Sequence, residues 1–168
     1  SILNGIISVL IFRLFLSFKL DKKISFFYAI SFGILAYPVS GTPFVDLHSV
    51  YFSIISIFFL IYALKTGELK YWYLLPIFLV FAFLSKQVPA AYICLSILLL
   101  IFYEFFLNKK KIIRISLTLG ASIVTCFVLI IFFFNYSNIS IQNFLDQYIN
   151  YPREIGSSRY TNLNYTFK

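Results

Sequence analysis

The chain is poor in charged residues. Of its 168 residues only 12% are charged and six are Asp or Glu, whereas a soluble domain carries about 25% charged residues. Hydrophobic residues make up 61% of the chain, and the mean hydropathy is +0.90. A soluble fold of this length could not hide so much apolar surface. The composition therefore predicts a polytopic membrane protein.

Methionine is absent, and the first residue is Ser1. We therefore expect the chain to be a piece of a longer protein. The first apolar run has neither a basic leader nor a small-residue cleavage site, so it does not have the pattern of a cleavable signal peptide. The two cysteines, Cys94 and Cys126, both lie inside apolar runs, where a disulfide has no obvious role.

Nucleotide-binding motifs are also missing, because the sequence has neither a Walker loop nor Gly-x-Gly-x-x-Gly. ATP-driven transport by this segment alone is therefore unsupported. The net charge of +8 would suggest nucleic acid in a soluble protein, but these Lys and Arg residues lie in short loops between apolar runs. We interpret them as topology signals and as contacts to membrane lipids, and we expect no nucleic-acid partner.

Six apolar runs approach the roughly 20 residues that a helix needs to cross a bilayer core of about 30 Å. They cover residues 2–18, 24–39, 49–64, 71–84, 90–107 and 112–134. The second and fourth runs are short for full crossings and could be re-entrant instead. We predict an all-α fold in which residues 1–134 form a transmembrane bundle of about six spans and residues 135–168 form an extracytoplasmic segment.

Positive charge collects in every second loop. The loops at 19–23, 65–70 and 109–114 are basic, whereas those at 38–49 and 85–89 are nearly free of Lys and Arg. Lys and Arg near helix ends are retained on the cytoplasmic side of a membrane. We therefore expect cytoplasmic basic loops and an extracytoplasmic tail, in the inner (plasma) membrane of a bacterium.

The tail contains an amphipathic pattern. Its apolar residues recur at helical spacing, at Ile141, Phe144, Leu145, Tyr148 and Ile149. Ser140 is a suitable N-cap, and Pro152 is expected to end the run. This pattern predicts a short helix lying flat on the outer leaflet. Beyond it, Gly156, Ser157 and Ser158 predict a flexible turn.

Asp46 and His48 are the first candidate binding residues. A carboxylate two residues from an imidazole could orient a sugar hydroxyl, hold a metal or act as a base. Alternatively, Asp46 could cap the third run through the N–H groups of its first turn. Two polar side chains are too few for a metal site, so we predict no metal.

Lys86 is the second candidate, because positive charge is otherwise kept from its side of the membrane. Its ammonium group suits a phosphate, although the residue could also be an interfacial anchor that extends to water. The tail offers a third candidate set, in which Arg153 and Arg159 could close over an anionic substrate. Those arginines could instead belong to a surface ion pair with Glu154.

The order of features over residues 1 to about 134 resembles a known family. An outer loop with Asp46 and His48 precedes a short basic turn at 65–70, the aromatic start Tyr71-Trp72-Tyr73 and the run Ala82-Phe83-Leu84-Ser85-Lys86. This order looks like the middle of the GT-C glycosyltransferases. The branch it is similar to contains the protein mannosyltransferases and the lipid A aminoarabinose transferases, which carry a run like Ala-Phe-Leu-Thr-Lys after the fourth helix.

The resemblance implies an integral-membrane enzyme without a cofactor. Such an enzyme would transfer a hexose or pentose from a polyprenyl-phosphate carrier to a glycan, lipid or protein acceptor on the outer face. Lys86 would match the basic residue near the carrier phosphate, and Asp46 an acidic residue of the second outer loop. Gln87, beside Lys86, is a further candidate for substrate binding, and it stands where the family usually has glycine. The family's main catalytic carboxylate lies in the first outer loop, which we expect to precede this chain, so no catalytic residue is assigned.

Other functional classes stay open. A polysaccharide polymerase or ligase of the outer face should have Arg-rich outer loops, and this chain has little Arg there. A secondary transporter should place polar residues or broken helices at mid-membrane. The apolar runs here are almost uniformly apolar, which disfavours transport more than polymerisation. A non-catalytic membrane subunit is also compatible with the sequence.

Overall fold

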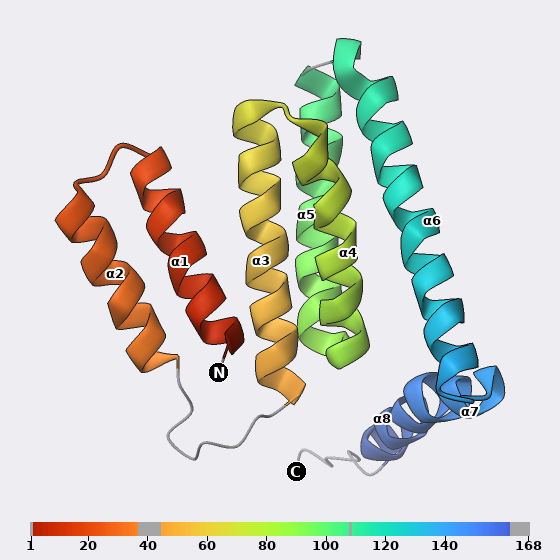
Figure 1. Ribbon diagram of the computed structural model, residues 1–168. Coiled ribbons are helices and arrows are strands. Elements are labelled where there is room, and N and C mark those ends of the chain that lie inside the picture. Colours follow the sequence, from red (N-terminus) through yellow and green to blue (C-terminus); the bar gives the residue numbers. More distant parts are fainter. Residues whose placement is uncertain (1, 37–44, 108, 162–168) are drawn as a thin grey trace, which may run out of the picture. The chain divides into compact units, whose positions relative to one another are not determined.

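The computed structural model describes residues 2–36, 45–107 and 109–161, and within these ranges the fold is all-α, as predicted (Figure 1). The side chains of residues 45, 46, 110 and 158–161 lie outside this description. The helices are α1 (Ile2–Ser17), α2 (Lys22–Leu35), α3 (Val45–Thr66), α4 (Leu69–Ser85), α5 (Gln87–Leu107), a 3-10 turn η1 (Lys109–Lys111), α6 (Ile112–Tyr136), α7 (Ile141–Leu145), a π-helical turn η2 (Asp146–Asn150) and α8 (Tyr151–Thr161). The chain divides into two compact units, residues 1–126 and 127–168.

Three helices in the described part, α3, α5 and α6, are long and apolar enough to cross a membrane. At 1.5 Å per residue, the 21 residues of α5 span about 32 Å, which matches the thickness of a bilayer core. Large apolar side chains of α5 are 59 to 77% exposed, namely Leu95, Leu99, Phe102 and Phe106. Three long apolar helices of this kind suggest an integral membrane protein.

The other apolar helices are shorter. Helices α1 and α4 have 16 and 17 residues, and α2 has 14. The run predicted over residues 24–39 is helical as far as Leu35, and residues 37–44 lie outside the described part. The Tyr51 hydroxyl on α3 donates to the Ala36 carbonyl over 2.8 Å. That bond satisfies one of the carbonyl groups that a helix C-terminus leaves unpaired.

Helices α1 and α2 form a close pair. Asp21 is the N-cap of α2, and its carboxylate accepts two backbone N–H groups of the first turn. Near the other end of the pair, Asn4 Nδ2 donates to the Gly33 carbonyl over 2.6 Å. A Cβ on Gly33 would lie 2.9 Å from Ser8 Oγ, so a larger residue there would displace the Ser8 hydroxyl from its bond to the Asn4 carbonyl.

One face of α3 is a buried seam with a spacing of four, three, four and three residues. Its members are Ser49, Ser53, Ser56, Leu60 and Ala63, all with 2% exposure or less. Four of these five side chains are small, which lets neighbouring helices pack closely against α3. Helices α4 and α5 are those neighbours. The buried core continues beyond the seam through Trp72, Leu75, Ile97, Ile101 and Ile115.

The second unit corrects two sequence predictions. Pro152 does not end the tail helix, because it is the second residue of α8, and Gly156 and Ser157 lie inside α8 rather than in a flexible turn. The reason is the π turn η2, in which the Tyr151 N–H bonds to the Asp146 carbonyl five residues earlier. A proline in a helix crowds the carbonyl four residues before it, and the wider π turn relieves that crowding. The predicted N-cap Ser140 does precede α7, but its side chain makes no capping hydrogen bond.

Candidate functional site

The junction between α4 and α5 is a single residue, Lys86. Its backbone is extended, with φ −159° and ψ 132°, and its N–H still bonds to the Ala82 carbonyl at the end of α4. Helix α5 then begins at Gln87, and Pro89 falls in the first turn, where a missing N–H breaks no intrahelical bond. The Lys86 side chain is exposed, and that of Gln87 is half-buried.

Ser49 connects this junction to α3. Its Oγ donates to the Lys86 carbonyl over 3.1 Å, and the Ser49 side chain is fully buried. A buried hydroxyl needs a partner, so this bond fixes the first turns of α3 against the α4–α5 junction. Because α4 ends and α5 begins at Lys86, the opposite partial charges of the two helix ends meet there. The Lys86 ammonium therefore supplies the positive charge of this junction.

Asp46 and His48 lie in the first turns of α3, next to Ser49. The His48 side chain is half-buried, whereas the Asp46 side chain lies outside the described residues. Because α3 is helical from Val45 onward, Asp46 is a residue of its first turn and not the N-cap. The hydrogen bond between Ser49 and Lys86 thus brings the helix turns that carry Asp46 and His48 to the junction that carries Lys86.

The basic turns gather at the other end of the same unit. Lys65 Nζ donates to the Ser17 carbonyl at the C-terminus of α1, and it lies 5.0 Å from the centre of the Phe18 ring. Lys111 Nζ lies 3.4 Å from the position that a Cβ would take on Gly67, which follows α3. The C-terminal ends of α1 and α3 and the turn η1 after α5 therefore meet. Lysines at helix C-termini also interact favourably with the helix dipole.

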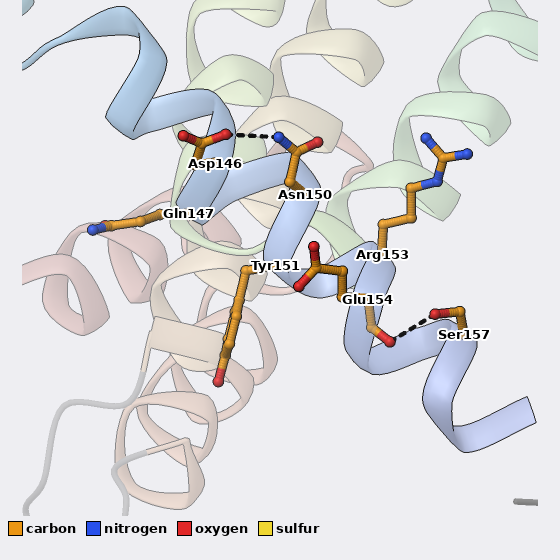
Figure 2. A pocket seen from close by; sticks show the side chains of 7 residues that line it. All are labelled: Asp146, Gln147, Asn150, Tyr151, Arg153, Glu154 and Ser157. Atoms are coloured by element: carbon orange, nitrogen blue, oxygen red, sulfur yellow. Dashed lines mark hydrogen bonds between the residues drawn. The ribbon is translucent and has the colours of Figure 1, made fainter. Parts of the chain in front are cut away.

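The second unit carries a polar hollow of about 760 Å³ along η2 and α8 (Figure 2). Its lining residues are Asp146, Gln147, Asn150, Tyr151, Arg153, Glu154 and Ser157. Asn150 Nδ2 donates to Asp146 Oδ1 over 2.7 Å, and the Gln142 amide donates to both oxygens of the same carboxylate at 3.3 Å. The hollow therefore presents amide, carboxylate and guanidinium groups to one space.

Arg153 is the predicted site residue that lines this hollow. Figure 2 shows its guanidinium directed away from the Glu154 carboxylate, so these neighbours do not form the ion pair that the sequence left open. Arg159 is a residue of α8, and its side chain lies outside the described residues. Beside the hollow, the Tyr148 ring stacks on Phe144 at 4.9 Å, and burial raises the pKa of the Tyr148 hydroxyl.

At the basic end, Lys70 is paired with a neighbouring carboxylate. Glu68 Oε2 and Lys70 Nζ form an ion pair at 2.5 Å, and the Lys70 ammonium lies 4.8 Å from the centre of the Tyr71 ring. The hydrogen bond that Lys70 donates to Glu68 raises the pKa of Lys70 above its ordinary value. Lys70 is exposed, so this pair contributes little to stability.

Sequence reasoning missed Ser49, which positions the candidate site. A serine in an apolar run carries no strong signal by itself. The spacing of Ser49, Ser53 and Ser56 was the available signal, because three small polar residues at intervals of four and three lie on one helix face. The partner of Ser49 is a carbonyl 37 residues away, which no local pattern predicts.

No family model, no curated protein and no solved structure matches this chain. The resemblance to GT-C glycosyltransferases therefore stays an expectation from short motifs. The chain is a helical protein whose three long apolar helices suggest membrane spans.

Proposed function

We propose that the chain is part of a membrane glycosyltransferase of the GT-C type. It would transfer a sugar from a polyprenyl-phosphate carrier to a glycan, lipid or protein acceptor on the outer face of a bacterial inner membrane. The observation that carries the proposal is the hydrogen bond from Ser49 to the Lys86 carbonyl. It joins the helix start that bears Asp46 and His48 to the lysine that the family resemblance assigns to the carrier phosphate.

The grouping of the loops supports the topology of this proposal. The three Lys-bearing turns meet at one end of the first unit through Lys65, Ser17 and Lys111. The nearly uncharged segments approach one another at the Ala36, Ser49 and Lys86 contacts. If all the apolar helices cross, the Lys-rich end is cytoplasmic and Lys86 is outside. The short helices α1, α2 and α4 would cross with local thinning of the bilayer.

Lys86 would act on the leaving group. In glycosyl transfer the acceptor hydroxyl forms a bond to the anomeric carbon, the bond from that carbon to the phosphate oxygen breaks, and polyprenyl phosphate leaves with the electron pair. A positive charge beside the phosphate stabilises the charge that develops there. His48 and Asp46 would contact sugar hydroxyls. The acceptor proton needs a base that we do not assign to this chain.

Farnesyl phosphate is a suitable probe, because it carries the phosphate and the prenyl chain without any assumption about the sugar. We expect Lys86→Ala to weaken its binding about tenfold or more, as for the loss of a charge-assisted hydrogen bond. Lys109→Ala, at the basic end, is the matched control and should bind as the unchanged chain does. In the enzyme that contains this segment, Lys86→Ala should abolish sugar transfer at unchanged expression.

Two results would overturn the proposal. One is equal binding of farnesyl phosphate and uncharged farnesol, which would mean that the phosphate is not recognised. The other is an unchanged affinity in Lys86→Ala, which would make Lys86 an interfacial anchor that extends to water. In both measurements circular dichroism should confirm that each variant keeps its helix content.

A further inference from the structure

We infer that the pair α1–α2 holds one anionic phospholipid, with an acyl chain in a groove between the helices and the headgroup phosphate at Lys22. The inference does not depend on the proposed transferase function. It starts from a hollow of about 520 Å³ on the first unit. Its lining residues are Ser8, Val9, Phe12, Lys22, Phe26, Ala29, Ile30, Gly33 and Ile34.

The groove has a small-residue floor and an apolar rim. Ser8, Ala29 and Gly33 form the floor, and the Ser8 hydroxyl is already bonded to the Asn4 carbonyl of its own helix at 3.0 Å. The rim carries large side chains such as Ile34, which is 69% exposed. A groove without unpaired polar groups suits a hydrocarbon chain, because nothing in it has to be desolvated.

The length of the groove along α2 matches one acyl chain of a lipid in a single leaflet. Lys22, Phe26, Ile30 and Ile34 follow each other at four-residue intervals, so they lie along one face of α2. From Lys22 to Ile34 the helix rises about 18 Å, which is slightly more than half of a bilayer core of about 30 Å. An acyl chain that starts at the Lys22 end would therefore stay within one leaflet.

The positive charge at the Lys22 end of the groove favours an anionic lipid headgroup. Lys22 is the charged residue of the groove lining, and it lies at one end of an otherwise apolar set. The nearby Asp21 carboxylate accepts the Lys23 backbone N–H at 2.8 Å, so capping of α2 occupies it. Lys19 and Lys23 add positive charge to the same turn. The end of the groove is therefore complementary to a phosphate, and a zwitterionic headgroup gains less there.

Native mass spectrometry of the purified chain tests the inference, after reconstitution in vesicles of equal parts phosphatidylglycerol and phosphatidylcholine. We expect retained phosphatidylglycerol to exceed phosphatidylcholine about fivefold, the ratio that one lysine near a membrane surface supplies. Lys22→Gln should remove this preference. Lys23→Gln, on the same turn but not in the groove lining, should keep most of it.

A second variant tests the groove without changing charge. Ile30→Trp puts bulk into the rim and should lower phosphatidylglycerol retention, whereas Leu99→Trp on the exposed face of α5 should not. Equal retention of the two lipids by the unchanged chain would overturn the inference. So would a Lys22→Gln variant with undiminished preference, or a dimer without bound lipid, which would mean that a second copy fills the groove.

Discussion

Ser122 on α6 donates a hydrogen bond of 2.6 Å to the backbone carbonyl of Tyr73 on α4. The acceptor lies three residues before Pro76, a buried proline inside α4. A proline supplies no N–H to the preceding turn and crowds its carbonyl groups. In membrane helices the hydroxyl of a neighbouring helix can pair with the disturbed backbone. The Tyr73 hydroxyl also pairs with Thr125 at 2.8 Å, one turn further along α6.

Ser122→Ala should therefore destabilise the protein by roughly 0.5 to 1.5 kcal/mol, the range measured for hydrogen bonds between membrane helices. Unfolding in mixed detergent micelles measures this change. Ser116→Ala, at an exposed position of α6, is the control and should have little effect. If Pro76 creates the need for the bond, the cost of Ser122→Ala should shrink in a Pro76→Ala background. Equal costs in both backgrounds would contradict that link.

For Ser53 we expect substitution by Ala to affect stability in the opposite way from the same substitution at Ser122. The Ser53 side chain is fully buried, and its hydroxyl has no hydrogen-bond partner among the described residues. Ser53→Ala removes an unpaired polar group while keeping the seam narrow, so we expect unchanged or higher stability. Ser53→Leu should be destabilising by roughly 1 to 3 kcal/mol, because the larger side chain separates α3 from its neighbours. A large loss in Ser53→Ala would indicate that the hydroxyl has a partner.

The topology predicts labelling from opposite sides of the membrane. In a chain with Cys94 and Cys126 replaced by Ala, we expect Lys86→Cys to react with an impermeant maleimide added outside intact cells. Lys109→Cys should react only after the membrane is opened. Reaction of both positions from the same compartment would contradict the alternation of basic and neutral ends.

We expect the Glu68–Lys70 ion pair to make a small contribution to stability that is lost at high pH. The pKa of Lys70 is raised chiefly by the hydrogen bond that it donates to Glu68, so the paired form is fully present below the ordinary lysine value of 10.5. The interaction is lost as pH rises through the higher value of the folded protein. Glu68→Gln should bring the pKa of Lys70 down toward 10.5, which NMR of ¹³C-methylated lysines can follow. An unchanged titration would mean that the ion pair does not persist in solution.

Local patterns were sufficient for the existence of the long helices but not for every start, because α3 begins at Val45 and therefore includes Asp46 and His48, which were predicted in an outer loop. Helix α6 begins at Ile112 as predicted, because the apolar run starts directly after the basic turn, and Pro89 falls in the first turn of α5. The tail prediction was wrong at Pro152, because the rule that proline ends a helix assumes regular α geometry before it. The π turn η2 changes that geometry, and no composition signal marks a π turn.

The sequence proposes the members of the candidate site, and the structure adds a contact between the segments that carry them. Charge alternation placed Lys86 and Asp46 at the same end, and the structure adds Ser49 as the residue that holds the two segments together. Tertiary hydrogen bonds to backbone carbonyls leave no trace in sequence spacing. The same holds for Ser122, whose partner carbonyl belongs to a residue 49 positions earlier in another helix.

The serine seam of α3 also bears on how the bundle responds to temperature. Parting α3 from α4 inside lipid would expose small hydroxylated side chains to hydrocarbon and almost no apolar surface to water. The heat-capacity change of unfolding comes from hydration of newly exposed surface. The enthalpy of separating these helices within the bilayer should therefore change little with temperature. Cooling weakens the hydrophobic cores of water-soluble proteins, but it should not weaken the packing of α3 against α4 in the same way.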